Sequence, residues 1–183
     1  MKTKLQIRKD MEMLRNKLTE EEKTRMDLSI YNKVIEHQVY KDAESIFIYV
    51  SYRKEVDTHK LIRHALNLGK TVAVPVILDQ KREFVAIGIS DLDKLKKNKY
   101  GILEPDLEQN NIIAAQKFDL AFIPGTAFDN NFGRVGYGAG MYDKYFSTKD
   151  IHSYKLALAY HFQVLDRVPM EEFDLRIDEL ITD

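Results

Sequence analysis

The sequence contains no cysteine and no tryptophan, and only four of its 183 residues are proline. Without cysteine, the chain can form neither a disulfide scaffold nor a zinc site held by thiolates. Its longest apolar stretches, such as residues 46–50, are the length of a strand, whereas a membrane-spanning helix needs about 20 apolar residues. The first ten residues are charged and lack the apolar core of a secretory signal. We therefore expect a cytoplasmic protein without membrane association.

An excess of positive charge is also missing, because 28 Lys and Arg residues face 29 Asp and Glu residues. A protein that holds nucleic acid through its overall charge needs such an excess, so we expect no nucleic-acid partner. The hydrophobic fraction of 44% is ordinary for a globular protein. No repeat, low-complexity segment or linker divides the chain, and its length suits one domain. The sequence therefore predicts a single domain over residues 1–183, and we expect a monomer.

Two charged helices are predicted before residue 40. In the first helix, four apolar residues recur at spacings of three, four or six with charged residues between them: Leu5, Met11, Leu14 and Leu18. Thr19 and Glu22 have the spacing of a capping box, which marks the start of the second helix. That helix should run to about His37, and its inward positions should be Met26, Ile30 and Val34, with Tyr31 as a further candidate. The chain thus begins with a two-helix N-terminal arm.

Strands and helices then alternate. Residues 45–51 form an apolar, β-branched and aromatic run that is typical of a strand buried on both faces. A helix should begin at Asp57 or Thr58 and end before Gly69, and a strand over residues 71–74 should end at Pro75. Such a β-α-β unit implies parallel strands with helices on their faces. Further elements are expected as strands over 81–89, 118–124 and 154–160, a helical turn within 91–98 and a helix over 141–146, followed by an exposed acidic segment over 168–179.

A glycine-rich loop precedes the helix expected at Met141. It contains four of the eight glycines of the chain: Gly133, Gly136, Gly138 and Gly140. Glycine lets the backbone approach a ligand closely, and successive free N–H groups form a cradle for an anion. Arg134 could add a bidentate phosphate contact. The loop matches neither the Walker A pattern nor the dinucleotide-binding pattern, so a flexible turn is the alternative interpretation.

Charged residues near this loop suggest how a phosphate ligand would be held. Asp143 would repel a phosphate unless a cation such as Mg²⁺ lay between them; the alternative is a carboxylate that complements the helix dipole. Lys4 and Arg8 are four residues apart, so they share a helix face on which an anion would relieve their repulsion. The alternative for this pair is a solvated basic face.

A second candidate loop, residues 51–58, follows the carboxyl end of the first strand, where open α/β sheets bind ligands. Tyr52 can stack on a flat heterocycle and Glu55 can accept hydrogen bonds from its N–H groups. An ordinary loop before a capped helix is the alternative. The five histidines lack the spacing of metal ligands, and no Gly-x-Ser-x-Gly nucleophile motif is present.

Taken together, these motifs resemble the 5-formyltetrahydrofolate cyclo-ligase family over nearly the whole chain. The resemblance is carried by Lys4-x-x-x-Arg8, the 51–58 loop with Glu55, Tyr100-Gly101-x-x-Glu104-Pro105, Pro124-Gly125-x-x-Phe128-Asp129, the glycine loop from Arg134 to Asp143, and Asp174-x-x-x-Asp178. It implies a three-layer α/β/α domain with a mostly parallel sheet. It also implies an enzyme that uses ATP and Mg²⁺ to convert 5-formyltetrahydrofolate to 5,10-methenyltetrahydrofolate, releasing ADP and phosphate.

The resemblance assigns roles to individual positions. Contacts with ATP are implied for Lys4, Leu5, Gln6, Ile7, Arg8, Arg134, Val135, Gly136, Tyr137, Gly138, Ala139, Gly140, Met141 and Tyr142. Contacts with the folate are implied for Val50, Glu55, Tyr137, Gly138, Ala139, Gly140 and Met141, to which the loop chemistry adds Tyr52. Asp143 and Asp174 are the implied metal ligands, and Lys4, Arg8 and Arg134 the implied catalytic cations.

Two positions depart from the family pattern. Many relatives have glycine in place of Ala139, where alanine would be strained if φ had to be positive. Many also have an aromatic residue in place of Met141, which would weaken a stacking role.

The implied reaction needs no protein nucleophile, since phosphorylation of the formyl oxygen would let N10 of the folate close the ring. Two other functions fit the same loop: a phosphotransferase acting on a sugar or nucleoside, and a non-catalytic sensor of a phosphate ligand.

Overall fold

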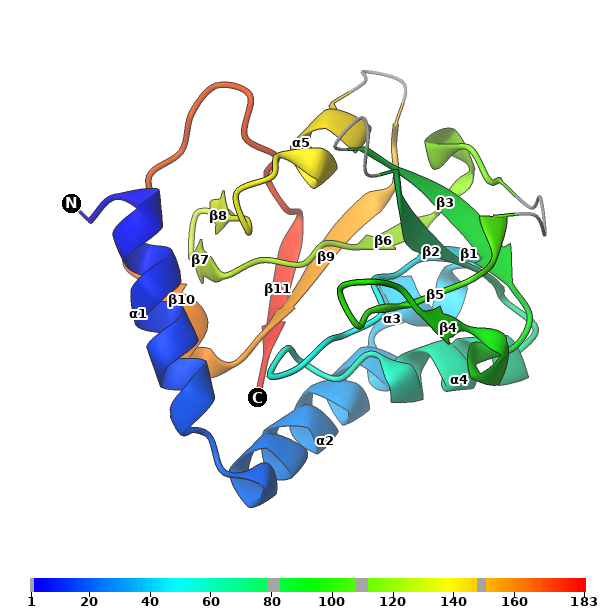
Figure 1. The fold of residues 1–183 in the computed structure, drawn as a ribbon, viewed down its shortest axis with the longest axis horizontal. Coiled ribbons are helices and arrows are strands. Elements are labelled where there is room, and N and C mark those ends of the chain that lie inside the picture. The colour runs from blue at the N-terminus through cyan, green and yellow to red at the C-terminus, as the bar shows by residue number, and fades with distance from the viewer. Residues whose placement is uncertain (1, 79–82, 108–111, 148–150) are drawn as a thin grey trace.

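The computed structural model describes residues 2–78, 83–107, 112–147 and 151–183. Its centre is a six-stranded sheet in the order β11-β9-β6-β1-β2-β3, in which β3 alone is antiparallel to its neighbour (Figure 1). The strands are β1 (Ser45–Phe47), β2 (Thr71–Leu78), β3 (Glu83–Ile89), β6 (Leu120–Phe122), β9 (Tyr154–Ala159) and β11 (Glu179–Thr182). This mostly parallel α/β architecture confirms the predicted fold class.

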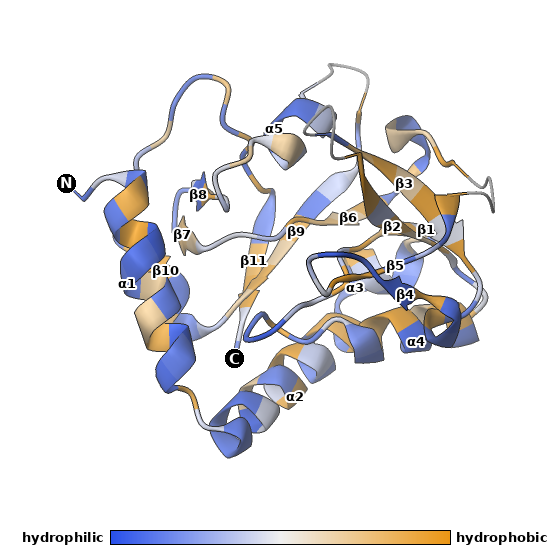
Figure 2. Ribbon diagram, in the orientation of Figure 1, coloured by the Kyte–Doolittle hydropathy of each residue, from blue (hydrophilic) through white to orange (hydrophobic). Residues whose placement is uncertain are grey.

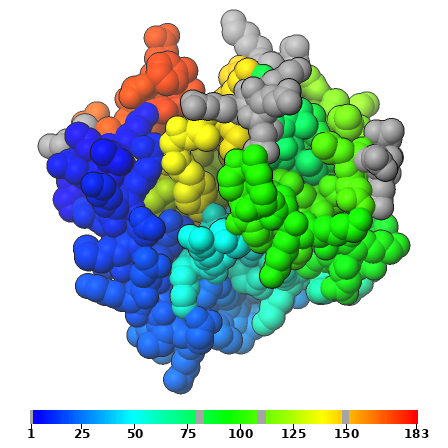
Figure 3. Space-filling model, viewed as in Figure 1, coloured from blue at the N-terminus to red at the C-terminus, as the bar shows by residue number. Residues whose placement is uncertain are grey.

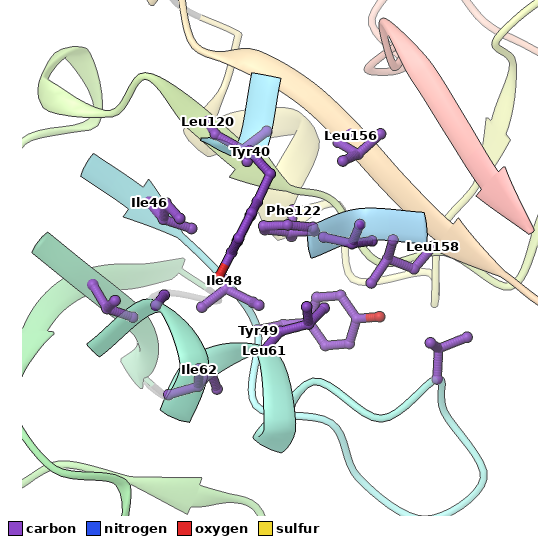
Figure 4. Close-up of a cluster of buried hydrophobic side chains, with 14 of the residues drawn as sticks. Tyr40, Ile46, Ile48, Tyr49, Leu61, Ile62, Leu120, Phe122, Leu156 and Leu158 are labelled. Carbon is purple, nitrogen blue, oxygen red and sulfur yellow. The ribbon is translucent and has the colours of Figure 1, made fainter. Parts of the chain in front are cut away.

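Three helices cover one face of the sheet: α2 (Glu20–Glu36), α3 (Gln38–Asp42) and α4 (His59–Asn67). Alternate strand residues such as Ile46, Leu120 and Phe122 pack against Tyr40 of α3 and Leu61 of α4 (Figure 4). Figure 2 shows that orange, hydrophobic residues run along the central strands while the outer faces of the helices are largely blue. The main hydrophobic core therefore lies between this helical layer and the sheet.

The opposite face has a thinner layer, made of α5 (Met141–Tyr145), the 3₁₀ helix η3 (Ala115–Lys117) and irregular chain. Small residues of the sheet, such as Ala121 and Ala157, let aromatic rings approach closely. Phe47 of β1 lies at the centre of these rings, and Phe84 of β3 stacks on it with 5.5 Å between the ring centroids. Phe84 also lies 4.4 Å from the ring of Tyr145, so this cluster fixes α5 against the sheet.

The first helix, α1 (Lys4–Lys17), packs on a separate three-stranded sheet with the order β10-β7-β8. Its strands are β7 (Ala127–Asp129), β8 (Arg134–Val135) and β10 (Val164–Leu165). The buried face of α1 consists of Ile7 and Met11. Of the apolar residues that mark the helix in the sequence, Met11 is buried, whereas Leu5 is 61% exposed and Leu14 is also exposed.

The remaining elements are short. The 3₁₀ helix η1 (Leu92–Lys94) leads into an antiparallel ribbon of β4 (Lys96–Lys97) and β5 (Leu103–Glu104), and η4 (His161–Gln163) follows β9. Among the described residues, no helix is long and apolar enough to cross a lipid bilayer.

Several boundaries follow the predicted local chemistry. The Thr19 side chain accepts a hydrogen bond from the N–H group of Glu22 while the Glu22 side chain accepts one from Thr19, which confirms the capping box of α2. Gly69 follows α4 as predicted, and its N–H donates to the Leu66 carbonyl at 3.0 Å. The helix at residues 141–146 and the strand at 154–160 are also present, each within one residue of its predicted end.

Other boundaries differ. The first strand ends at Phe47 rather than residue 51, although the Ile48 N–H still donates to the Ala73 carbonyl. Pro75 does not end β2, which continues to Leu78. Proline has no N–H to donate, but β1 pairs with β2 only as far as Ala73, so no bond to β1 is lost at Pro75. Of the strand predicted over residues 81–89, positions 81 and 82 lie outside the described residues.

The segment over residues 168–179 is also not simply exposed. Val168 and Ile177 are buried, whereas Phe173 is 73% exposed. This segment returns the chain to β11, which pairs with β9 and closes the edge of the main sheet. Acidic composition concealed this role, because the two buried apolar residues are isolated among charged ones.

Candidate active site

A cavity of about 450 Å³ opens where α1, the glycine loop, α5 and the closing segment of the chain meet. We call it the basic cavity. Its lining comprises Lys4, Arg8, Arg134, Gly136, Tyr137, Gly138, Ala139, Gly140, Met141, Tyr142, Asp143, Lys144, Ser147, Phe173 and Asp174. In Figure 3 the yellow glycine-loop region lies between the blue N-terminal helix and the green chain that follows β3. Four cations and two carboxylates therefore surround one opening.

The first turn of α1 supplies two of these cations. Thr3 caps α1 through a capping box with Gln6, which fixes the direction in which the helix begins. The Lys4 ammonium lies 2.5 Å from Asp174 Oδ2. The Arg8 Nε atom donates to the Gly136 carbonyl at 2.7 Å, and no carboxylate of the described chain forms an ion pair with Arg8. The predicted shared face of Lys4 and Arg8 is thus turned toward the cavity.

Arg134 is buried at the base of the cavity, with only 4% of its surface exposed. Its Nη1 atom donates to the Pro124 carbonyl at 3.0 Å and its Nη2 atom to Asp143 Oδ1 at 2.6 Å. Its Nε atom has no hydrogen-bond partner within the described part of the chain. A Cβ atom at Gly136 would lie 2.8 Å from Arg134 Nη1, so glycine is needed there to admit the guanidinium. Arg134 consequently organises the loop as well as contributing charge.

The loop backbone after Gly136 is exposed to the cavity. Gly138 has a φ of +107°, a conformation that L side chains rarely adopt. Among the residues that the structure describes, none accepts a hydrogen bond from the N–H groups of Gly138, Ala139 or Gly140. Ala139 is not in the left-handed region, so alanine creates no backbone strain at this position. Helix α5 has only five residues, so the cradle depends on the loop amides rather than on a helix dipole.

Asp143 and Asp174 both line the basic cavity, and the Leu175 N–H next to Asp174 donates to Asp143 Oδ1 at 2.9 Å. Asp174 Oδ2 accepts from Lys4 and from the Glu171 N–H at 2.6 Å. Burial alone would raise the pKa of the Asp174 carboxyl, but these hydrogen bonds outweigh it and hold that pKa below its usual value.

Each of these two carboxylates keeps one oxygen without a partner among the described residues. No group of three metal-ligating side chains is found in the described ranges. One or two carboxylates combined with phosphate oxygens is the usual way in which proteins hold Mg²⁺. The two free carboxylate oxygens fit that mode of binding.

A second cavity of about 330 Å³ lies behind the glycine loop, and we call it the apolar cavity. Its lining comprises Tyr49, Val50, Tyr52, Glu55, Pro75, Ile77, Phe84, Ile102, Leu103, Glu104, Pro124, Tyr137, Met141 and Tyr142. Tyr137, Met141 and Tyr142 line both cavities. Aromatic and aliphatic side chains thus enclose a space that suits a flat organic ligand, directly beside the basic cavity.

Glu55 is held in place from both sides. Its Oε2 atom accepts a hydrogen bond from the Tyr52 N–H at 2.8 Å, and its Oε1 atom accepts one from the Tyr137 hydroxyl. Burial raises the pKa of the Glu55 carboxyl, while these hydrogen bonds partly oppose the shift. The Tyr160 hydroxyl lies 3.2 Å from the Glu55 carbonyl and donates to Asp27 at 2.8 Å, which ties the loop to α2. Glu55 therefore couples the 51–58 loop to the glycine loop.

The structure brings together most of the predicted site. The basic cavity contains Lys4, Arg8, Arg134, Asp143, Asp174 and the loop from Gly136 to Tyr142, and the apolar cavity contains Val50, Tyr52, Glu55, Tyr137 and Met141. Four predicted ATP contacts line neither cavity. Leu5 is exposed to solvent and Gln6 caps α1, while Ile7 and Val135 are buried together between α1 and the small sheet. Gly138, Ala139 and Gly140 line the basic cavity alone.

Sequence reasoning missed several wall residues of the apolar cavity. Tyr49 and Phe84 belong to apolar runs whose pattern predicts only strands, and Ile77 follows the proline that was predicted to end its strand. Glu104 stands in a motif that carried the family resemblance, but no role was derived for it.

An α/β fold with two adjoining cavities, one cationic and one apolar, is typical of an enzyme that binds two ligands side by side. The model of the 5-formyltetrahydrofolate cyclo-ligase family matches residues 1–183, and the chain belongs to this family. Its activity is accordingly that of a 5-formyltetrahydrofolate cyclo-ligase, an ATP-dependent ligase of folate one-carbon metabolism.

Individual relatives agree with this match. The chain is 29% identical to a Caenorhabditis elegans protein named as a probable 5-formyltetrahydrofolate cyclo-ligase, over 97% of this chain and 91% of the relative. It is 28% identical to the Mus musculus 5-formyltetrahydrofolate cyclo-ligase, over 96% and 91%. The NMR structure of Aquifex aeolicus 5,10-methenyltetrahydrofolate synthetase superposes with a TM-score of 0.84 at 27% identity, covering 97% of this chain and 88% of that one.

Proposed function

We propose that the basic cavity binds the triphosphate of ATP and that the apolar cavity binds 5-formyltetrahydrofolate. The observation that carries this assignment is the wall that both cavities share, formed by Tyr137, Met141 and Tyr142. A ligand in one cavity is then in reach of a ligand in the other, as transfer of a phosphoryl group between them requires.

In this proposal the formyl oxygen of the folate attacks the γ-phosphorus of ATP. The O–P bond forms as the bond from the γ-phosphorus to ADP breaks, and the formyl carbon becomes an electrophile. N10 of the same folate then attacks this carbon and releases its proton. The bond from the carbon to the phosphorylated oxygen breaks, which yields the methenyl bridge and inorganic phosphate.

The chain's own residues supply position and charge. The Arg8 guanidinium and the Lys4 ammonium would neutralise charge on the phosphates, while the free N–H groups of the glycine loop would hold their oxygens. Arg134 packs beneath Gly136 and donates to the Pro124 carbonyl, which supports the conformation of the glycine loop. The apolar walls exclude water, which protects the reactive carbon from hydrolysis.

We further propose that Asp143 and Asp174 hold Mg²⁺ through their free oxygens, together with phosphate oxygens of ATP. A bound Mg²⁺ would add positive charge at the phosphates undergoing transfer. Met141 lies in the shared wall, where a flexible side chain can fit against either ligand.

The test is a spectroscopic assay of substitutions, each in one cavity. Protein, Mg·ATP and 5-formyltetrahydrofolate are mixed, and the conjugated methenyl product is followed by its near-ultraviolet absorption. We expect Arg8→Gln to raise the KM for ATP at least tenfold with little change in the KM for folate, and Tyr52→Leu to do the reverse. If each substitution changed the KM for the other substrate instead, the assignment of the cavities would be wrong.

A further inference from the structure

Two carboxylates line the apolar cavity, and they are not equivalent. Both oxygens of Glu55 already accept hydrogen bonds from the protein, one from Tyr52 and one from Tyr137. Glu104 accepts a single hydrogen bond, from the Ile77 N–H to its Oε1 atom at 3.1 Å. Within the described part of the chain, its Oε2 atom has no partner. Each carboxylate oxygen can accept two hydrogen bonds, so Glu104, with only one bond in all, has the greater capacity left to accept hydrogen bonds from a ligand.

The fold holds this carboxylate in one orientation. Glu104 lies on β5, whose antiparallel pairing places it opposite Lys96 of β4. The Lys96 ammonium lies 2.6 Å from Asp106, which draws that cation toward a carboxylate outside the cavity lining. Glu104 binds the N–H of Ile77 on β2. This N–H is available because the pairing of β2 with β1 ends at Ala73, so no β1 residue accepts from it. One oxygen of Glu104 is thus fixed by the backbone.

The surroundings of Glu104 are apolar. Ile77 and Phe84 are paired across β2 and β3, and Ile102 and Leu103 precede Glu104 on its own segment. A carboxylate among such walls selects a ligand that brings its own hydrogen-bond donors, because an unpaired polar group in this space is costly. A flat ring with two adjacent N–H donors matches a carboxylate oxygen pair best.

We propose that Glu104 is the residue that recognises the aminopyrimidinone edge of the pterin ring, through the ring N–H and the neighbouring exocyclic amino group. This inference depends on the proposed folate occupancy of the apolar cavity, and it assigns Glu104 a specificity role distinct from that of Glu55. Glu55, in addition, braces the 51–58 loop against Tyr137. The free oxygen of Glu104 and the oxygen on Ile77 form the acceptor pair.

The first test is Glu104→Gln. The glutamine carbonyl can still accept the hydrogen bond from Ile77, but its amide group replaces the second acceptor with a donor. We expect the KM for 5-formyltetrahydrofolate to rise about 10- to 100-fold and the KM for ATP to stay within about twofold, since a buried site that hydrogen-bonds its ligand discriminates strongly. Asp93→Asn is the control, because it removes a negative charge from a surface ion pair with Arg63 outside the cavity lining, and its folate KM should not change.

The second test changes the ligand and needs only the wild-type protein for its main arm. An analogue of 5-formyltetrahydrofolate that lacks the 2-amino group should have a KM at least tenfold higher than the normal substrate. In Glu104→Gln this preference should largely disappear, as expected for two groups that contact each other.

An unchanged folate KM in a folded Glu104→Gln variant, or equal use of both ligands by the wild type, would overturn the role of Glu104. Both results leave the proposed function intact as long as the wild type forms the methenyl product. Failure of the wild type to form that product would instead refute the function itself. Because the analogue arm uses wild-type protein, the inference stays testable even if Glu104→Gln does not fold.

Discussion

The Nζ atom of Lys4 lies 2.5 Å from the Oδ2 atom of Asp174, which joins the first turn of α1 to the closing segment of the chain. Both side chains line the basic cavity. The contact therefore completes a site whose two walls are at opposite ends of the sequence. It also places a cation beside a carboxylate that has one free oxygen, an arrangement that suits the proposed site for phosphate and Mg²⁺.

The role of Lys4 can be separated from general helix charge. Lys4→Met should lower kcat/KM for ATP about 100-fold, because a charge-assisted contact with the phosphates is lost. Lys2→Met is the matched control, since Lys2 is an exposed neighbour that pairs with Asp10. Steady-state assays with varied ATP measure both. Equal losses in the two variants would show that Lys4 acts only through the overall charge of the helix end.

The glycine loop offers a matched pair of substitutions. Gly136→Ala places a Cβ atom 2.8 Å from Arg134 Nη1, so the guanidinium must move; we expect a destabilisation of about 1–3 kcal/mol and a fall in kcat of at least tenfold. Ala139→Gly, three residues away, should change stability by about 1 kcal/mol or less and should retain activity. Urea denaturation and turnover measure these effects. A fully active Gly136→Ala enzyme would contradict the positioning role of Arg134.

Metal dependence tests the carboxylates. Asp143→Asn should raise the Mg²⁺ concentration for half-maximal activity about tenfold or more, because one anionic oxygen ligand is lost. Asp93→Asn is the control: Asp93 also pairs with an arginine, Arg63, but on the protein surface outside the basic cavity. Its Mg²⁺ titration should match the wild type. An unchanged titration in Asp143→Asn would remove this residue from the metal site.

Glu55 predicts a pH dependence of stability. Burial raises the pKa of its carboxyl, so between the ordinary glutamate value and the raised value the folded state binds more protons than the unfolded state. The free energy of unfolding contributed by Glu55 therefore falls as pH rises through that window. Since Glu55→Gln lacks this titration, its stability relative to the wild type should increase with pH.

In the control variant, the stability relative to the wild type should change with pH in the opposite direction. A hydrogen bond from Lys41 lowers the pKa of the exposed Glu36 carboxyl, so the ionised form stabilises the folded state. Relative to the wild type, Glu36→Gln should therefore lose stability as pH rises through the window below the ordinary value. Urea denaturation over a pH series measures both. If the two variants had slopes of the same sign, the environment assigned to Glu55 would be incorrect.

Local patterns in the sequence predicted much of the fold. The capping box at Thr19 and the glycine after α4 each act through neighbouring residues, so their outcome is set locally. The failure at Pro75 has a non-local cause, because it depends on how far β1 extends alongside β2. Helix α3 was missed since its five residues are too few for a periodic pattern.

In the candidate site, too, the features set by neighbouring residues could be predicted and those set by distant residues could not. The glycine loop and the Lys4 and Arg8 pair were visible as short motifs. The burial of Arg134 and its contact with the Pro124 carbonyl were not, because they depend on how β8 packs beneath α1. Glu104 could be noticed in a motif but not interpreted, as its free oxygen emerges only when β5 reaches Ile77 of β2.

The most direct test of the two-cavity site is a crystal structure with a non-hydrolysable ATP analogue, Mg²⁺ and 5-formyltetrahydrofolate. We expect the triphosphate along the amides of Gly138 to Gly140 between Lys4 and Arg8, and the pterin ring in the apolar cavity with its formyl oxygen toward the γ-phosphate. A triphosphate bound elsewhere, with the glycine loop free of ligand, would contradict the assignment.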